Sequence, residues 1–185
     1  MQSIGDKIIL GIDPGTTVLG YAIIEIKKKN VSVLTLGIVN LSKIKEHPEK
    51  LQKIYERIEQ LILAYKPTEM AIEAPFFGKN VQSMLKLGRA QGVAMAAAMV
   101  NKISVSEFSP RKIKQSITGN GNASKEQVSA MLVSLLKIDL FNEKLDATDA
   151  LAAALCCHYQ SNSAGTSAKA KDWSQFLKDN PDRIK

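Results

Sequence analysis

Short apolar segments rich in isoleucine and valine fill most of the first forty residues. Turn-forming residues at Gly15–Thr17 and polar residues at Lys27–Asn30 separate them. A run of this kind bounded by turn residues is typical of a β-strand. The pattern therefore predicts three strands that pair antiparallel as a hairpin or meander, over Lys7–Asp13, Gly20–Ile26 and Val31–Asn40.

Two amphipathic or apolar segments follow, and a short strand is predicted after each of them. In Pro48–Tyr65 apolar residues recur at three- and four-residue steps, which predicts a helix that ends at Lys66-Pro67. The segment Asn80–Asn101 becomes apolar nearly all round from Gly92, so we predict a long and deeply buried helix. The accompanying strands are predicted at Met70–Ala74 and Ile103–Phe108.

Two glycines of the second segment, Gly88 and Gly92, lie four residues apart and would let another backbone approach closely. Close packing inside the monomer is the preferred interpretation. A contact between two copies of the chain is the alternative.

The last part of the domain is predicted to be helical. Ser109-Pro110 suits a helix start, Ser124 and Gln127 have the spacing of a capping box, and Asp146–His158 forms the final helix. Strands first and helices interleaved indicate an α/β domain around a mixed sheet. We expect one domain over residues 1–160 and a polar tail over 161–185, in which Trp173, Phe176 and Leu177 could dock as one turn.

Composition narrows the class of protein. A length of 185 residues suits one domain, and 45% hydrophobic with 23% charged residues is ordinary for a soluble globular protein. No signal peptide opens the chain, and the apolar run Val93–Val100 is far shorter than a membrane span, so we expect no membrane association. The adjacent Cys156 and Cys157 do not suit a stabilising bridge, which predicts reduced thiols and a cytoplasmic location.

The positive charge is concentrated in one stretch. The formal net charge is +7, and the segment from Lys79 to Lys125 carries eight basic residues against the single acid Glu107, an excess equal to that of the whole chain. Such asymmetry favours a polyanionic partner, with solvated helix faces as the alternative.

Four acidic residues stand at the edges of apolar elements. Asp13 and Glu73 each end an apolar strand, and Asp146 and Asp149 lie one turn apart on one helical face. Each acid alone has a structural explanation, as a turn residue, a lysine partner, an N-cap or a first-turn acid. If the strands and the helix converge, however, four carboxylates share one pocket, and only a cation makes that arrangement stable.

Oxygen ligands without a histidine or cysteine pattern predict Mg²⁺, with Mn²⁺ able to substitute, rather than zinc. Two such ions about 4 Å apart would clamp a scissile phosphate and activate the attacking water. The cluster Cys156-Cys157-His158 lacks zinc-site spacing and is interpreted as core thiols with a histidine at a helix end.

Five short motifs place these acids in a recognisable order. They are Gly11-Ile12-Asp13-Pro14-Gly15, Ala71-Ile72-Glu73, Phe76-Phe77-Gly78-Lys79-Asn80, the segment from Leu85 to Val93, and Asp146-Ala147-Thr148-Asp149-Ala150-Leu151-Ala152. Together they resemble the RuvC family of bacterial Holliday junction resolvases (crossover junction endodeoxyribonucleases). The resemblance covers about Lys7 to His158.

The resemblance implies a ribonuclease-H-like fold with a mixed five-stranded sheet flanked by helices. It also implies a homodimer that makes paired symmetric nicks in four-way junctions during recombination and repair, with the RuvA–RuvB branch-migration complex as partner. Asp13, Glu73, Asp146 and Asp149 fall on the family's catalytic acids, Phe76 on an aromatic that stacks on a base, and Lys114 and Lys125 on basic positions important for DNA binding. The sequence departs from the pattern at Ala74-Pro75, where bulkier or polar residues are expected.

The predicted DNA contacts agree with elementary physics. Phe76 and Phe77 lie in loop-like sequence, where an exposed ring can contribute on the order of 1–3 kcal/mol by stacking on a base. Core packing is the alternative for these rings. We expect phosphate contacts from Lys79, Arg111, Lys112, Lys114 and Lys125.

Two other classes of protein compete with this interpretation. The segment Gly11–Thr17 also looks like the first phosphate loop of an actin- or Hsp70-like ATPase, but those proteins need two such domains around the nucleotide. The second is a non-catalytic junction-binding module, against which the four intact acids argue.

Overall fold

A mixed five-stranded sheet forms the centre of the computed structural model, which describes residues 6–28, 30–75, 80–140 and 143–166. The strand order is β3-β2-β1-β4-β5, with β1, β2 and β3 antiparallel and β4 and β5 parallel to β1. The strands are β1 (Lys7–Asp13), β2 (Val18–Lys27), β3 (Asn30–Asn40), β4 (Glu69–Glu73) and β5 (Ser104–Phe108). This is the predicted mixed sheet, with the antiparallel strands first in the chain.

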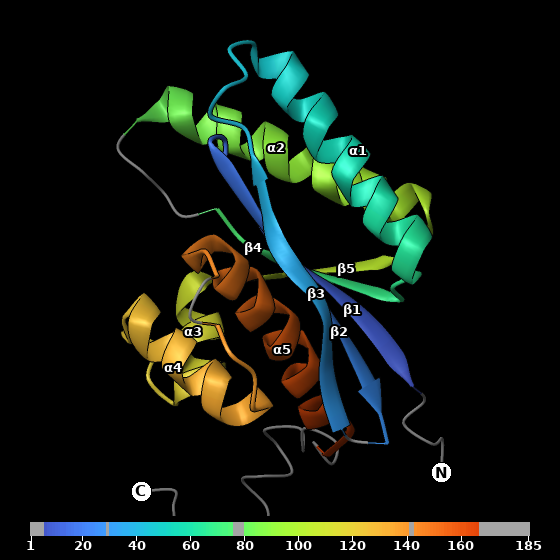
Figure 1. Ribbon diagram of the computed structural model, residues 1–185, viewed down its shortest axis with the longest axis vertical. Helices are drawn as coiled ribbons and strands as arrows, with labels where there is room; N and C mark the ends of the chain where they lie inside the picture. Colours follow the sequence, from blue (N-terminus) through green and yellow to red (C-terminus); the bar gives the residue numbers. More distant parts are fainter. Residues whose placement is uncertain (1–5, 29, 76–79, 141–142, 167–185) are drawn as a thin grey trace, which may run out of the picture.

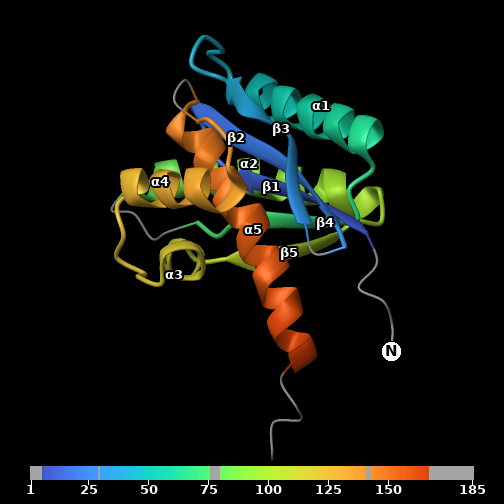
Figure 2. The same ribbon diagram turned by 60° about the horizontal axis from the view of Figure 1, so that its bottom comes forward.

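Helices cover both faces of this sheet (Figure 1). On one face lie α1 (His47–Tyr65) and α2 (Val81–Val100), which pack against each other. On the other face lies α5 (Leu145–Thr166), against which α3 (Pro110–Thr118) and α4 (Lys125–Leu136) pack, as Figure 2 shows from a second side. The fold therefore has three layers, and α5 is the helix in closest contact with β1 and β2.

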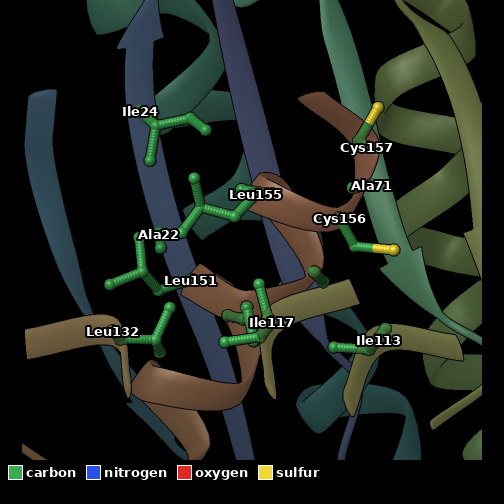
Figure 3. Close-up of a cluster of buried hydrophobic side chains, with 14 of the residues drawn as sticks. Ala22, Ile24, Ala71, Ile113, Ile117, Leu132, Leu151, Leu155, Cys156 and Cys157 are labelled. Carbon is green, nitrogen blue, oxygen red and sulfur yellow. The ribbon is translucent and has the colours of Figure 1, made fainter. Parts of the chain in front are cut away.

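Each face of the sheet has its own hydrophobic core. The core beneath α5 combines strand residues such as Ala22 and Ile24 with Leu151 and Leu155 of the helix (Figure 3). Cys156 and Cys157 belong to this core, and both are free thiols. Burial, together with a hydrogen bond to Glu69, raises the pKa of Cys157 to about 12, so this thiol stays protonated. The interpretation of the pair as core thiols is confirmed, but His158 is not at a helix end, because α5 continues to Thr166.

The predicted helix starts are confirmed in detail. Ser109 caps α3 by accepting a hydrogen bond from the backbone of Lys112, and Pro110 opens the helix. Ser124 and Gln127 form the complete capping box of α4. These devices are local, so the sequence alone was sufficient to place them.

Two expectations for α2 are wrong. From Gly92 the helix is not deeply buried, because Gly92, Ala96, Met99 and Val100 are exposed. Nor does packing inside the monomer explain the glycines, since a Cβ added at Gly88 or Gly92 would meet no atom within 4 Å. In the apolar part of α2, one side is packed inside the domain and the opposite side faces outward.

The final helix is longer than expected. It continues past His158 and past Ser161 as far as Thr166, so the first residues of the expected tail are helical. Ser161 is tied to the domain, because its Oγ accepts a 2.7 Å hydrogen bond from Nζ of Lys7. Residues 167–185, including Trp173, Phe176 and Leu177, lie outside the described residues, and the rest of that expectation stays a prediction.

Among the described helices, none combines the length and apolar character that a membrane crossing requires.

Candidate active site

Two of the predicted acids lie at one edge of the sheet because their strands are parallel neighbours. Asp13 is the last residue of β1 and Glu73 the last of β4. The strands pair in register immediately before these residues, with Ile12 opposite Ile72. Carboxyl ends of parallel neighbours point the same way, so a pairing between segments sixty residues apart places the two carboxylates together.

The other two acids reach this edge on α5. Asp146 lies in the first turn of the helix and Asp149 follows three residues later. Asp146 is therefore a residue inside the helix and not its N-cap, which was one of the structural explanations considered for it. The helix begins beside the end of β1, because Gly20, which pairs with Asp13, lies against the backbone of Asp146.

Two glycines allow α5 to lie directly on the sheet. Gly20 of β2 pairs with Asp13, and a Cβ added there would stand 1.9 Å from the carbonyl oxygen of Asp146. A Cβ added at Gly11 would stand 2.0 Å from the carbonyl oxygen of Ala150. No side chain fits at either point, so these glycines set how near Asp146 and Asp149 come to Asp13.

The carboxylates influence one another electrostatically. The pKa of Asp13 is raised to about 8, first by burial and then by the negative charges of Glu73, Asp149 and Asp146, which the charge of Lys125 offsets only in part. Burial likewise raises the pKa of Glu73 to about 7, with Asp149 as the next cause. The electrostatic effects on Asp13 and Glu73 indicate that the four acids lie near one another at this edge of the sheet, and their role as ligands of one metal site stays a prediction.

Two predicted basic residues face the same pocket. Nζ of Lys125, the first residue of α4, forms an ion pair and hydrogen bond with Oδ2 of Asp149. Burial disfavours the charged form of Lys125, but this hydrogen bond and the charges of Asp149, Asp13 and Asp146 outweigh it and raise the lysine pKa. The charge of Lys114, on α3, lowers the pKa of Glu73. Both lysines therefore lie within electrostatic reach of the acids.

The pocket suits a hard divalent cation by its chemistry. Its donors are carboxylate oxygens, which Mg²⁺ and Mn²⁺ prefer. The raised pKa values reflect burial first and then a repulsion between the carboxylates, which a cation would relieve. Within the described part of the chain, no three His, Cys, Asp or Glu side chains are already gathered closely enough to hold a metal ion. The ion pair of Lys125 with Asp149 balances part of the negative charge in this arrangement.

The remaining predicted DNA contacts are divided between two regions. Arg111 and Lys112 lie in the first turn of α3, where the Arg111 side chain packs close to Gly121 and Nζ of Lys112 stands 5.3 Å from the centre of the Phe108 ring. Phe76, Phe77 and Lys79 lie outside the described residues, in the connection between β4 and α2. Their predicted roles therefore stay predictions.

Sequence reasoning did not identify Gly20 as a residue that positions the site. It looked like the first residue of a strand, and nothing in its neighbours signals that a helix more than a hundred residues later will rest on it. Only the pairing of Gly20 with the already suspected Asp13 could have suggested a role.

With this geometry established, comparison with known proteins decides the family. The sequence profile described as "Crossover junction endodeoxyribonuclease RuvC" matches residues 9–158. The chain belongs to the RuvC family. It is 55% identical to the crossover junction endodeoxyribonuclease RuvC of Cytophaga hutchinsonii, over 97% of this chain and 89% of that protein. It is 53% identical to that of Christiangramia forsetii, over 97% of this chain and 94% of the relative.

Solved structures agree with this membership of the RuvC family. Thermus thermophilus RuvC in complex with a Holliday junction substrate superimposes with a TM-score of 0.79 at 28% identity, covering 85% of this chain and 96% of that one. The yeast mitochondrial Holliday junction resolvase has a TM-score of 0.60 at 14% identity, which is a likeness of fold alone. The ribonuclease-H-like α/β architecture predicted from the sequence is confirmed.

Proposed function

We propose that this protein is a structure-selective endonuclease that resolves four-way DNA junctions by paired symmetric nicks, in recombination and DNA repair. One observation carries the proposal. In a chain of the RuvC family, Asp13, Glu73, Asp146 and Asp149 come from three elements and lie close enough to influence one another electrostatically. The related Thermus thermophilus RuvC binds a Holliday junction substrate.

The four carboxylates would hold the metal ions, with Mg²⁺ as the physiological ion and Mn²⁺ as a substitute. When bound, two ions per site would supply the Lewis acidity needed for phosphodiester hydrolysis and for charge build-up on the leaving oxygen. Asp13 and Glu73 lie on rigid strand ends, so they would form the fixed part of the site. Asp146 and Asp149 would complete it from the helix.

The protonation of Asp13 and Glu73 affects how readily this pocket would bind a metal ion. Burial and the neighbouring acids raise the pKa of Asp13 to about 8 and that of Glu73 to about 7, so protons remain on the pair near neutral pH until a cation displaces them. Lys125 forms an ion pair with Asp149 and, beside the acids, would contact the phosphate of the cleaved strand.

The DNA would be held by the basic residues around the pocket. Lys114 and Lys125 lie closest to the acids, and Arg111 and Lys112 extend the positive surface along the start of α3. We further propose that Lys79 contacts phosphate and that Phe76 or Phe77 stacks on an unpaired base at the junction centre, as the sequence suggests.

The exposed side of α2 supports a homodimer. Val81, Leu85, Gly88, Gly92, Ala96 and Met99 follow one another at three- and four-residue steps, and the large side chains among them are 52–69% exposed. Val100, 75% exposed, adjoins this stripe. The glycines leave room for a second backbone, and large flanking side chains add apolar area that a solitary chain would leave in water. A two-fold dimer would present two active sites to a two-fold symmetric junction.

Two further assignments belong to this proposal. We place the protein in the cytoplasm, which agrees with free, buried Cys156 and Cys157. We also infer that the RuvA–RuvB branch-migration complex is a partner, which rests on the family alone.

A non-catalytic junction-binding module remains the second candidate function, because the basic surface alone would bind branched DNA. The raised pKa of Asp13 disfavours it, since a module that only binds an anion gains nothing from crowding buried carboxylates beside the DNA. The ATPase interpretation is disfavoured by membership of the RuvC family.

The decisive experiment incubates the protein with a synthetic four-way junction and with a linear duplex of matched sequence, each with and without Mg²⁺. We expect symmetric nicks in the junction only when Mg²⁺ is present, and no cutting of the duplex. Binding of the junction without any Mg²⁺-dependent nick would instead favour the non-catalytic module.

A further inference from the structure

A groove of about 420 Å³ adjoins the catalytic acids and has no role in the function described so far. The turn between β1 and β2 forms one wall, with Thr16 and Thr17. The first two turns of α2 form the other, with Ser83, Met84 and Leu87. Asp146 is among the lining residues, so the groove opens directly beside the metal-binding pocket.

The lining selects against a phosphate and in favour of a neutral, partly apolar group. Among the described residues that line the groove, none is a lysine or arginine, and the only charged one is Asp146. Three hydroxyl groups can donate or accept hydrogen bonds, while Met84 and Leu87 offer apolar surface. A nucleobase with its deoxyribose has this combination of an apolar face and a hydrogen-bonding edge.

The two walls are held in place by interactions outside the groove. Nζ of Lys50 donates a 3.0 Å hydrogen bond to the carbonyl oxygen of Thr16, and the backbone amide of Leu41 donates a 2.8 Å bond to that of Thr17. On the other wall, Asn80 caps α2 by accepting a 3.0 Å hydrogen bond from the backbone of Ser83. A preformed groove loses little entropy when it is filled, so its contacts can contribute to recognition.

The covalent connection between neighbouring nucleotides of a DNA strand indicates what the groove would bind. If the acids bind the scissile phosphate, a nucleoside joined to that phosphate would lie next to Asp146, which lines the groove. We propose that this groove binds the base and deoxyribose of a nucleotide flanking the scissile phosphate, and that Thr16, Thr17 and Ser83 thereby select the sequence at which a junction is cut. This inference rests on the proposed nuclease function.

The hydroxyl groups give the inference a measurable consequence. A hydrogen bond made to one base and lost with another changes the relative rate of cleavage by about tenfold. Recognition of this kind changes which junction is cut faster, while it leaves the general attraction of the basic surface for DNA untouched.

The test compares four-way junctions that differ only in the base pairs flanking the cut. Thr17→Val and Ser83→Ala each remove one exposed hydroxyl with little change of side-chain volume. We expect the ratio of kcat/KM between the fastest and slowest junctions to change by about tenfold in these variants. Junction binding without Mg²⁺ should stay within about twofold of the parent. Ser32→Ala, on β3 at the far end of the sheet from Asp13, serves as the matched control and should leave the ratio unchanged.

The possible results distinguish a failure of the groove's role from a failure of the nuclease function. A parent protein that cuts every junction equally, or variants that slow all junctions by the same factor or not at all, would overturn the role of the groove. A parent protein that cuts no junction with Mg²⁺ would overturn the nuclease function itself, and this inference with it.

Discussion

Asp13 has a larger upward pKa shift than Glu73, its neighbour on the adjacent strand. It ends an apolar strand and is surrounded by Glu73, Asp146 and Asp149, and its pKa rises to about 8 because burial and these charges disfavour ionisation. Such a carboxyl group is poorly suited to stabilising the fold alone. It is well suited to a site that takes up a cation, because a bound cation would remove the repulsion between the carboxylates.

We predict that Asp13→Asn abolishes Mg²⁺-dependent nicking of four-way junctions, by at least about 100-fold, while junction binding is retained. The amide keeps the shape of the side chain but removes a negatively charged ligand. Nicking assays and gel-shift binding measured on the same preparation check this. Asp6→Asn, an exposed acid just before β1, is the matched control. Normal cutting by Asp13→Asn would refute the metal assignment.

The same residue makes the stability of the metal-free protein depend on pH. Because the pKa of Asp13 is raised from 3.8 to about 8, and that of Glu73 from 4.5 to about 7, the folded state binds more protons than the unfolded state between these values. Unfolding free energy therefore falls as the pH rises across this window.

We predict that Asp13→Asn, in the presence of a chelator, raises Tm relative to the parent by about 2–6 °C near pH 8, with little difference near pH 4. Thermal unfolding followed by circular dichroism across the pH range measures this. Addition of Mg²⁺ should raise the Tm of the parent more than that of the variant. A variant with the lower Tm at pH 8 would show that Asp13 stabilises the fold by another contact.

At the level of elements, the site depends on how closely α5 approaches β1 and β2. The helix backbone rests on Gly11 and Gly20, where no Cβ can be accommodated. Helix and strands also share the core of Figure 3, so the helix is fixed along its length by Leu151, Leu155 and their neighbours. The position of its first turn at the pocket is therefore set by packing farther along the same helix.

We predict that Gly20→Ala displaces the start of α5 and raises the Mg²⁺ concentration for half-maximal cleavage by about tenfold, while junction binding without metal is retained. Gly37→Ala is the matched control, because a Cβ there would approach only the end of the Tyr21 side chain. Cleavage titrated with Mg²⁺ and Tm are measured on both variants. Loss of Tm in Gly20→Ala with an unchanged Mg²⁺ requirement would assign the glycine a purely structural role.

At the level of the whole molecule, the exposed side of α2 and the basic surface around the acids would act together in a dimer bound to one junction. A solitary chain leaves Leu85 and Met99 in water at 52% and 63% exposure. Pairing through α2 would bury this side, and a two-fold arrangement would let one junction be cut on two strands by equivalent sites.

We predict that Leu85→Glu converts the protein to a monomer at micromolar concentration, because a charged side chain on the shared side opposes burial. Sedimentation equilibrium gives the mass. On a supercoiled plasmid with an extruded junction, paired cleavage should give way to single nicks. Leu135→Glu, on the similarly exposed part of α4, is the control and should remain a dimer. A dimeric Leu85→Glu would place the shared surface elsewhere.

Much of the architecture was accessible from local patterns. The elements and their order follow from hydrophobic period and capping residues, which act within a few positions, and β1 was placed without error. Asp13, Glu73, Asp146 and Asp149 could be singled out as candidate ligands because a carboxylate at the end of an apolar segment is conspicuous in any sequence. The RuvC family was recognisable because its motifs stand in order along almost the whole domain.

Other features required the tertiary structure. The exposed side of α2 was predicted to be buried because composition shows that a surface is apolar but not what covers it. Gly20 and the groove beside Asp146 exist only where β2, α2 and α5 meet, and those segments are distant in the chain. The amino-acid sequence by itself determined the chemistry and the local elements, since both depend on neighbouring residues. Distances and solvent exposure were decided by long-range strand pairing and by the packing of helices on both faces of the sheet.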